Sequence, residues 1–174
     1  MFYLVRHGEP DYSEANTKIY HDIGIELSPL TENGRMQIKK VAEDPRLQNA
    51  SIIISSPFTR ALQTAAILSK KLGLDIIVET DLHEWMANKD YIYVDDETAK
   101  KNYHEYIDNK GYYPEGEPKD WETTAMMKER FVNVLKKYKN YDDVIVTCHG
   151  MIMEAVTGMH HPKHGEIFEF EVES

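Results

Sequence analysis

Two arginines and two histidines each stand just after a short β-branched run that is typical of a buried strand. The runs and the side chains that follow them are Phe2–Val5 with Arg6 and His7, Ile52–Ser55 with Arg60, and Val144–Thr147 with His149. If the runs are parallel strands of one sheet, their carboxyl ends meet at one edge, where open α/β sheets bind ligands. The sequence therefore predicts a positively charged pocket built from three separate segments.

Such a pocket suits a phosphoryl group, because two guanidinium groups can bind its oxygens in a bidentate fashion. Helix N-termini expected near Pro57 and Met151 would add backbone N–H groups and the positive end of the helix dipole. Gly8 and Gly150, each directly after a histidine, would let the backbone approach a ligand closely. We expect Gly8, Gly150 and Met151 to bind substrate together with the charged side chains.

Histidine is the remaining candidate for the nucleophile. The chain has no glycine-rich phosphate loop with Lys and Ser/Thr and no serine elbow. Its single cysteine, Cys148, lacks the neighbours of a cysteine-based phosphatase loop and is expected to be a buried small residue. Attack on phosphorus by an imidazole, with arginines neutralising the oxygens, requires no metal ion. We therefore expect neither a metal nor another cofactor.

The elements that must position these residues alternate between β-branched runs and segments of helical spacing. This alternation predicts an α/β fold with a mainly parallel sheet. Five strands are expected, at Phe2–Val5, Ile52–Ser55, Ile76–Glu79, Val144–Thr147 and Ile167–Val172. The last alternates apolar and acidic residues and is expected at an edge or with one wet face, whereas the others are expected to be buried.

Four helices are expected between the strands. They run from a cap at Thr31 to about Glu43, from a cap at Ser56 with Pro57 as first helical residue to before Gly73, from about Thr123 to Tyr138, and from Met151 to Thr157. Helices on both faces of the sheet make a three-layer sandwich, which we expect to be a single domain over residues 1–174.

Residues 88–121 interrupt this pattern and are expected to form a small lid with an aromatic core. Their tyrosines are Tyr91, Tyr93, Tyr103, Tyr106, Tyr112 and Tyr113. Four lysines of this region could reach a substrate: Lys89, Lys100, Lys101 and Lys110. Beyond the lid, His160, His161 and His164 match no strong zinc signature, so we expect a solvated loop there.

Composition limits the classes of function. The chain has 174 residues, with 20 Lys and Arg against 30 Asp and Glu, a formal net charge of −10. This acidic balance argues against a nucleic-acid partner, whose phosphates require many basic residues. No stretch approaches the roughly 20 apolar residues of a membrane span, so no membrane partner is expected. A lone cysteine fits a reduced, cytoplasmic setting, and the oligomeric state is left open.

Motifs spread over nearly the whole chain resemble those of one known family. They are LVRHGE at Leu4–Glu9, LTENGRMQ at Leu30–Gln37, SSPFTRALQTA at Ser55–Ala65, LHEW at Leu82–Trp85 and VTCHG at Val146–Gly150. In these motifs and their order the sequence is similar to the histidine phosphatase superfamily, in its phosphoglycerate mutase-like branch. It differs from that family at Pro10, where many members carry a hydroxyl residue, and at Asn16, which stands further from His7 than the family's asparagine.

The resemblance implies catalytic roles. His7 would attack phosphorus and carry the phosphoryl group as a phosphohistidine, while Arg6, Arg60 and His149 would hold the phosphoryl oxygens. Glu84 would protonate the leaving oxygen and then accept a proton from the attacking water. Three nearby carboxylates are alternatives for this proton transfer: Glu9, Asp11 and Glu79.

Together these features predict a metal-independent phosphatase that hydrolyses a phosphomonoester of a small metabolite through a phosphohistidine. A phosphosugar, a phosphorylated carboxylic acid, a nucleotide and a phosphopeptide all remain candidate substrates. A phosphoglycerate mutase is the alternative. It would use the same pocket but would need a larger and more basic lid, and this chain is short in that region. A non-catalytic phosphate-binding or scaffold protein is disfavoured, because all five chemical positions hold competent residues.

Overall fold

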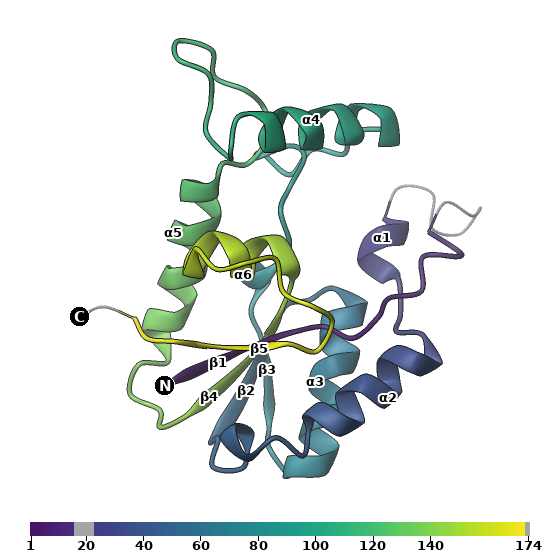
Figure 1. The fold of residues 1–174 in the computed structure, drawn as a ribbon, viewed down its shortest axis with the longest axis vertical. Coiled ribbons are helices and arrows are strands. Elements are labelled where there is room, and N and C mark those ends of the chain that lie inside the picture. Colours follow the sequence, from purple (N-terminus) through teal and green to yellow (C-terminus); the bar gives the residue numbers. More distant parts are fainter. Residues whose placement is uncertain (16–22, 173–174) are drawn as a thin grey trace.

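A five-stranded sheet lies at the centre of the computed structural model, which describes residues 1–15 and 23–172 (Figure 1). Its strands are β1 (Phe2–Arg6), β2 (Ile52–Ser55), β3 (Ile76–Val78), β4 (Val144–Cys148) and β5 (Ile167–Phe170). The spatial order is β3-β2-β4-β1-β5, and only the pairing of β5 with β1 is antiparallel. The predicted α/β class is confirmed, and so is the edge position of the last strand.

The strand register brings the ends of β1, β2 and β4 together. Arg6 pairs with Cys148, and Ser55 pairs with Thr147. Two backbone hydrogen bonds extend the register by one residue: His7 donates to the Cys148 carbonyl at 3.1 Å, and Ser56 donates to the Thr147 carbonyl at 3.0 Å. The residues that follow these three strands therefore leave the sheet side by side.

The prediction that β3 is buried was wrong. Ile77 and Val78 are 37% and 49% exposed, because β3 is the second edge of the sheet and pairs with β2 alone. An apolar run shows that a segment favours extended structure, but it does not reveal how many strands will lie beside it.

The four expected helices are present, with others between them. They are α2 (Glu32–Val41), α3 (Thr59–Leu72), α5 (Thr124–Lys137) and α6 (Gly150–Thr157), joined by α1 (Gly24–Leu27), α4 (Asp96–Asp108) and the 3₁₀ turns η1 (Pro45–Leu47) and η2 (Thr80–Leu82). Thr31 and Thr123 cap α2 and α5 through their hydroxyls, and Gly73 ends α3 in the left-handed conformation. Within residues 1–15 and 23–172, every helix is too short or too polar to cross a bilayer.

The start of α3 differs from the expectation. Ser56 does not cap the helix, which begins three residues later at Thr59. The Ser56 hydroxyl accepts from the Phe58 N–H at 3.3 Å and lies 2.7 Å from Nε2 of His149. A side chain that resembles a helix cap in the sequence thus belongs to the contacts of the predicted pocket.

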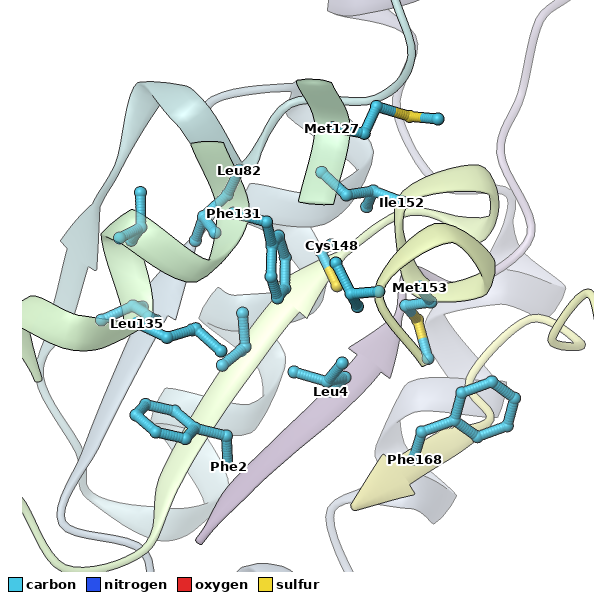
Figure 2. Close-up of a cluster of buried hydrophobic side chains, with 14 of the residues drawn as sticks. Phe2, Leu4, Leu82, Met127, Phe131, Leu135, Cys148, Ile152, Met153 and Phe168 are labelled. Atoms are coloured by element: carbon cyan, nitrogen blue, oxygen red, sulfur yellow. The ribbon is translucent and has the colours of Figure 1, made fainter. Parts of the chain in front are cut away.

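Two apolar clusters hold the layers together, one on each face of the sheet. On one face Leu4 and Val146 pack with Phe131 of α5 and Ile152 of α6, as Figure 2 shows in part. On the other face the neighbouring strand residues, among them Val5 and Ile53, pack against α2 and α3; Ile38 and Leu68 are their helical partners. Successive strand residues point to opposite faces, so continuous β-branched runs supply both clusters.

The lid contains a helix that the sequence analysis missed. Helix α4 begins after Asp95, whose carboxylate accepts from the Thr98 N–H at 2.8 Å. Its residues are too polar to show a clear apolar stripe, which is why the periodicity did not reveal it. Tyr106, on the helix, meets the rings of Trp85 and Trp121, each with 5.6 Å between ring centroids. The contact between Tyr106 and Trp85 joins the lid to the body of the protein, and Figure 1 shows α4 at one end of the molecule.

Candidate active site

His7 stands at the carboxyl end of β1 with its ring held in one tautomer. Its Nδ1 lies 2.7 Å from the carbonyl oxygen of Gly8, which can only accept, so Nδ1 carries the proton. Its Nε2 accepts a hydrogen bond from Nε of Arg60 at 3.2 Å. The lone pair of Nε2 therefore faces the guanidinium of Arg60.

The surroundings of His7 favour the neutral imidazole. Burial, followed by the positive charge of Arg60, lowers the pKa of His7 to about 2, although the bond to Gly8 acts in the opposite direction. Only 3% of the residue is exposed. A neutral ring with an unprotonated nitrogen is the form that a histidine nucleophile requires.

Arg60, in the first turn of α3, is fixed from two sides. Its Nη1 donates to the carbonyl oxygen of Ile25 in α1 at 2.7 Å, and Nε donates to His7. The guanidinium carbon also lies 5.2 Å from the ring centre of Phe58 and 5.8 Å from that of Tyr12. The charge is thus presented to His7 from a buried position.

Arg6 and His149 carry buried polar atoms that have no partner among the described residues. Nη1 of Arg6 donates to the Pro162 carbonyl oxygen, whereas its Nε is unpaired. The His149 ring is fully buried, 5.2 Å from the His7 ring between centroids, and its Nδ1 is unpaired. The Thr147 hydroxyl of β4 is also buried and unpaired among the described residues. Because buried polar atoms are nearly always satisfied in proteins, the two nitrogens are available to donate to a bound anion.

Glu84 lies on the segment after η2 and occupies the N-terminus of α6. Its Oε1 accepts from the N–H groups of Trp85 at 2.9 Å and Ile152 at 3.2 Å, and its Oε2 accepts from Met151 at 3.1 Å. These bonds hold the carboxylate in place. Met151, which the sequence analysis assigned to the substrate, gives its N–H to Glu84 in this structure.

Gly8 and Gly150 are each confined by a different neighbour that leaves no room for a side chain. A Cβ at Gly8 would lie 2.6 Å from the carbonyl oxygen of Gly34 in α2, and the Gly8 N–H donates to the Thr64 hydroxyl at 3.2 Å. Its close approach is therefore to α2. A Cβ at Gly150 would lie 2.5 Å from the His161 ring. Within the described residues the N–H of Gly150 has no acceptor, so it can still bind a ligand.

The alternative carboxylates are occupied elsewhere. Glu9 accepts from the Thr31 hydroxyl at 2.7 Å, Asp11 from the Ser13 N–H at 2.9 Å, and Glu79 from Lys137 at 2.8 Å. Pro10 forms an isolated bridge with Leu30. Asn16 lies outside the described residues. Of the carboxylates that the sequence analysis considered for proton transfer, Glu84 is the one that shares a cleft with Arg60.

A buried ion pair that the sequence analysis missed holds the segment carrying Glu84. Nη1 of Arg130 donates to the carbonyl oxygens of Asp81 at 2.6 Å and His83 at 2.8 Å, and Nη2 donates to that of Glu84 at 3.2 Å. Its Nε donates to Glu122 at 2.5 Å, and the other Glu122 oxygen accepts from the Met86 N–H at 3.1 Å. No local pattern marks this pair, because Glu and Arg side chains are usually exposed.

The histidine loop only partly matches the expectation of a solvated loop. His160 is exposed, but the ring of His164 lies 5.6 Å from the His7 ring between centroids, and His161 covers Gly150. The loop is tied to Arg6, since the Arg6 N–H donates to the Glu166 carbonyl and the Gly165 N–H donates to the Arg6 carbonyl, both at 3.0 Å. Among the described residues no group of His, Cys, Asp and Glu side chains is arranged to hold a metal ion.

Comparison with known proteins agrees with this geometry. Residues 2–171 match the histidine phosphatase superfamily (branch 1), and the chain belongs to that family. A relative named probable phosphoglycerate mutase GpmB, from Enterobacter sp. (strain 638), is 42% identical over 82 residues, which are 47% of this chain and 36% of the relative. The match thus spans little more than a third of that relative's length, and the same holds for its counterpart from Photorhabdus laumondii, at 40% identity.

Solved structures show the same fold. The native structure of a mycobacterial glucosyl-3-phosphoglycerate phosphatase superposes with a TM-score of 0.65 at 20% identity, covering 90% of this chain and 77% of that one. Bacillus stearothermophilus YhfR superposes with a TM-score of 0.64 at 22% identity, with the same coverage of 90% and 77%. At this identity the likeness concerns the fold.

Proposed function

We propose that this protein is a phosphomonoester hydrolase that works through a phosphohistidine at His7 and uses neither a metal nor another cofactor. The observation that carries the proposal is the lone pair on Nε2 of His7, which faces Arg60 beside two unpaired buried polar atoms. A phosphoryl group at this point would give oxygen acceptors to Nε of Arg6 and to Nδ1 of His149. The N–H of Gly150 would supply a further donor.

In the first step the substrate phosphorus takes the position beside Nε2 that Nε of Arg60 now occupies. The nitrogen of His7 forms a bond to phosphorus while the ester P–O bond breaks. Arg6 and Arg60 neutralise the phosphoryl oxygens in the transition state. Glu84 gives its proton to the leaving oxygen, and an alcohol departs.

In the second step a water molecule attacks the phosphohistidine. Its proton passes to Glu84, the P–N bond breaks and inorganic phosphate is released, which returns the site to its starting state. A carboxylate has about four acceptor positions, and the backbone N–H groups of Trp85, Met151 and Ile152 use three of them. One position is left for the transferred proton.

Cysteine chemistry fits less well than this route. Cys148 is fully buried, and burial raises the pKa of its thiol, so the thiolate is disfavoured. The same burial agrees with a cysteine kept reduced in the cytoplasm. We propose a small phosphorylated molecule as the substrate, and the acidic net charge of −10 argues against nucleic acid.

A phosphoglycerate mutase is the second candidate, because the relatives that match part of the chain carry that name. The mutase would use the same pocket and would return the phosphoryl group to a second hydroxyl of the bound acid. The two candidates differ in the acceptor: water in the hydrolase and a glycerate in the mutase. A non-catalytic phosphate-binding protein would perform neither transfer.

The proposal is tested by measuring release of phosphate from phenyl phosphate with a chelator present, together with interconversion of 2- and 3-phosphoglycerate. We expect chelator-resistant hydrolysis that the His7→Ala variant loses and that His160→Ala, a change at an exposed histidine, retains. Interconversion of the phosphoglycerates faster than hydrolysis would contradict the hydrolase proposal and support the mutase. Phosphate binding without either reaction would contradict both enzymes.

A further inference from the structure

A cleft of about 240 Å³ opens beside the proposed reacting groups, and Arg60 and Glu84 form part of its wall. It lies between α1 and the beginning of the lid, so a substrate whose phosphoryl group lies against His7 would extend its leaving group into it. The cleft is smaller than the roughly 300 Å³ at the lower end of sites for drug-sized ligands. It can therefore hold a single ring or a short chain.

The walls of the cleft are mainly apolar. The side chains that matter most for an occupant come from both sides and are Ile25, Phe58, Trp85, Ile92 and Val94. Two of them are aromatic, and Ile92 is 64% exposed. An apolar occupant would remove part of this surface from water.

The charges around the cleft are mostly negative. Besides Glu84, its lining contains the carboxylates of Glu26 and Asp96. Arg60 is the one basic lining residue among those the structure describes, and it is already bonded to His7 and to the carbonyl of Ile25. No positive group of this lining is left for a second anion on the substrate.

The lysines that could have changed this balance lie outside the cleft. Lys89 donates to the carbonyl oxygen of Lys119 at 2.7 Å and lies 3.8 Å from Asp120. Lys100, Lys101 and Lys110 are exposed and do not line the cleft. None of the four lid lysines considered for substrate binding therefore lines this cleft.

From this cleft we infer the substrate class: a phosphomonoester whose leaving group is uncharged, about the size of one ring, and apolar on at least one face. The inference rests on the proposed function, because it assumes that the phosphoryl group is transferred to His7. A carboxylate or a second phosphate on the leaving group would meet Glu26 and Asp96, and the described lining offers no free cation to balance it. This excludes phosphoglycerates as good substrates.

Two esters of the same shape test the inference: 4-carbamoylphenyl phosphate, which is uncharged at the ring, and 4-carboxyphenyl phosphate, which is anionic there. At low salt we expect kcat/KM to be about tenfold or more higher for the carbamoyl ester, and added salt to narrow the difference. Equal hydrolysis of both esters, or faster hydrolysis of the carboxyl ester, would overturn the inference while leaving the proposed function intact.

Variants identify the groups responsible. Asp96→Asn and Glu26→Gln should each raise kcat/KM for the carboxyl ester several-fold relative to the carbamoyl ester, so that the ratio between the two esters narrows. Asp108→Asn, at the far end of α4, is the matched control and should change neither. If neither ester is hydrolysed, the proposed function fails. In that case the binding affinities of the phosphonate analogues of the two esters test the selectivity of the cleft. Equal affinities would overturn the inferred preference for an uncharged leaving group.

Discussion

The pocket around His7 and the cleft under the lid lie next to each other but are built in opposite ways. The pocket residues follow buried parallel strands, and His7 and His149 are almost or fully buried. The cleft is formed by α1 and by lid residues such as Ile92 and Tyr93, which are largely exposed. One region is fixed by the sheet, whereas the other is fixed by a few aromatic contacts to the body of the protein.

This difference separates the chemistry from the choice of substrate. Strand register places the charged groups of the pocket, so under the proposed function these residues would do one reaction on many esters. The lid contributes walls and charge to the neighbouring cleft and would select the leaving group. Fold alone therefore does not determine the substrate, and function must be argued from each site.

Glu84 is the residue where the two regions meet, and its replacement has the largest effect expected here. Glu84→Gln keeps the shape but removes the proton donor, so kcat for phenyl phosphate should fall about 10²–10⁴-fold. The loss should be much smaller for 4-nitrophenyl phosphate, whose leaving oxygen needs little protonation. Glu26→Gln, a change at another carboxylate of the same cleft, is the control. Equal losses on both esters would contradict the role of general acid.

Acid should lower the stability of the folded protein through the buried pocket histidine. Because the pKa of folded His7 is about 2 while that of an unfolded histidine is near 6.5, the unfolded state binds more protons between these values. Stability is therefore lost as the pH falls from 7 to 5, and His7 alone accounts for about 2 kcal/mol of the free energy of unfolding. Denaturant unfolding at both pH values measures this change. A His7→Asn variant with the wild-type pH dependence would contradict it.

Arg130 positions Glu84 from outside the pocket. Lysine cannot bond three carbonyl oxygens and the Glu122 carboxylate at once, so Arg130→Lys should lower kcat about tenfold with little change in KM. As with Glu84→Gln, the loss should depend on the leaving group. Arg35→Lys, which alters an exposed pair with Glu32, is the matched control. A loss that is the same for phenyl and 4-nitrophenyl esters would indicate damage to the fold instead of misplacement of the acid.

A change confined to the lid should have the smallest effect. Ile92→Ala removes apolar surface from the cleft wall and should raise KM for the carbamoyl ester about two- to fivefold, with kcat unchanged. Thermal unfolding should shift very little, because the side chain is 64% exposed. An unaltered KM would show that the leaving group does not contact this wall.

The sequence predicted the pocket better than the lid for a physical reason. Strands, helix caps and the residues that follow them depend on local pattern, so β2 was predicted with its exact bounds and Thr31 as a cap. The exposure of β3 depends on strand order, which no local pattern contains. The Glu122–Arg130 pair and the approach of His164 to His7 arise from tertiary contacts between distant segments.

The central claim is transfer of the phosphoryl group to His7, and direct trapping tests it best. The protein is mixed with ³²P-labelled phenyl phosphate, quenched in alkali during turnover, and digested so that the labelled peptide can be sequenced. We expect a base-stable, acid-labile label on the peptide that contains His7, and a stronger label in Glu84→Gln when 4-nitrophenyl phosphate is the donor. Rapid turnover with no such label, or with the label on another residue, would contradict this claim.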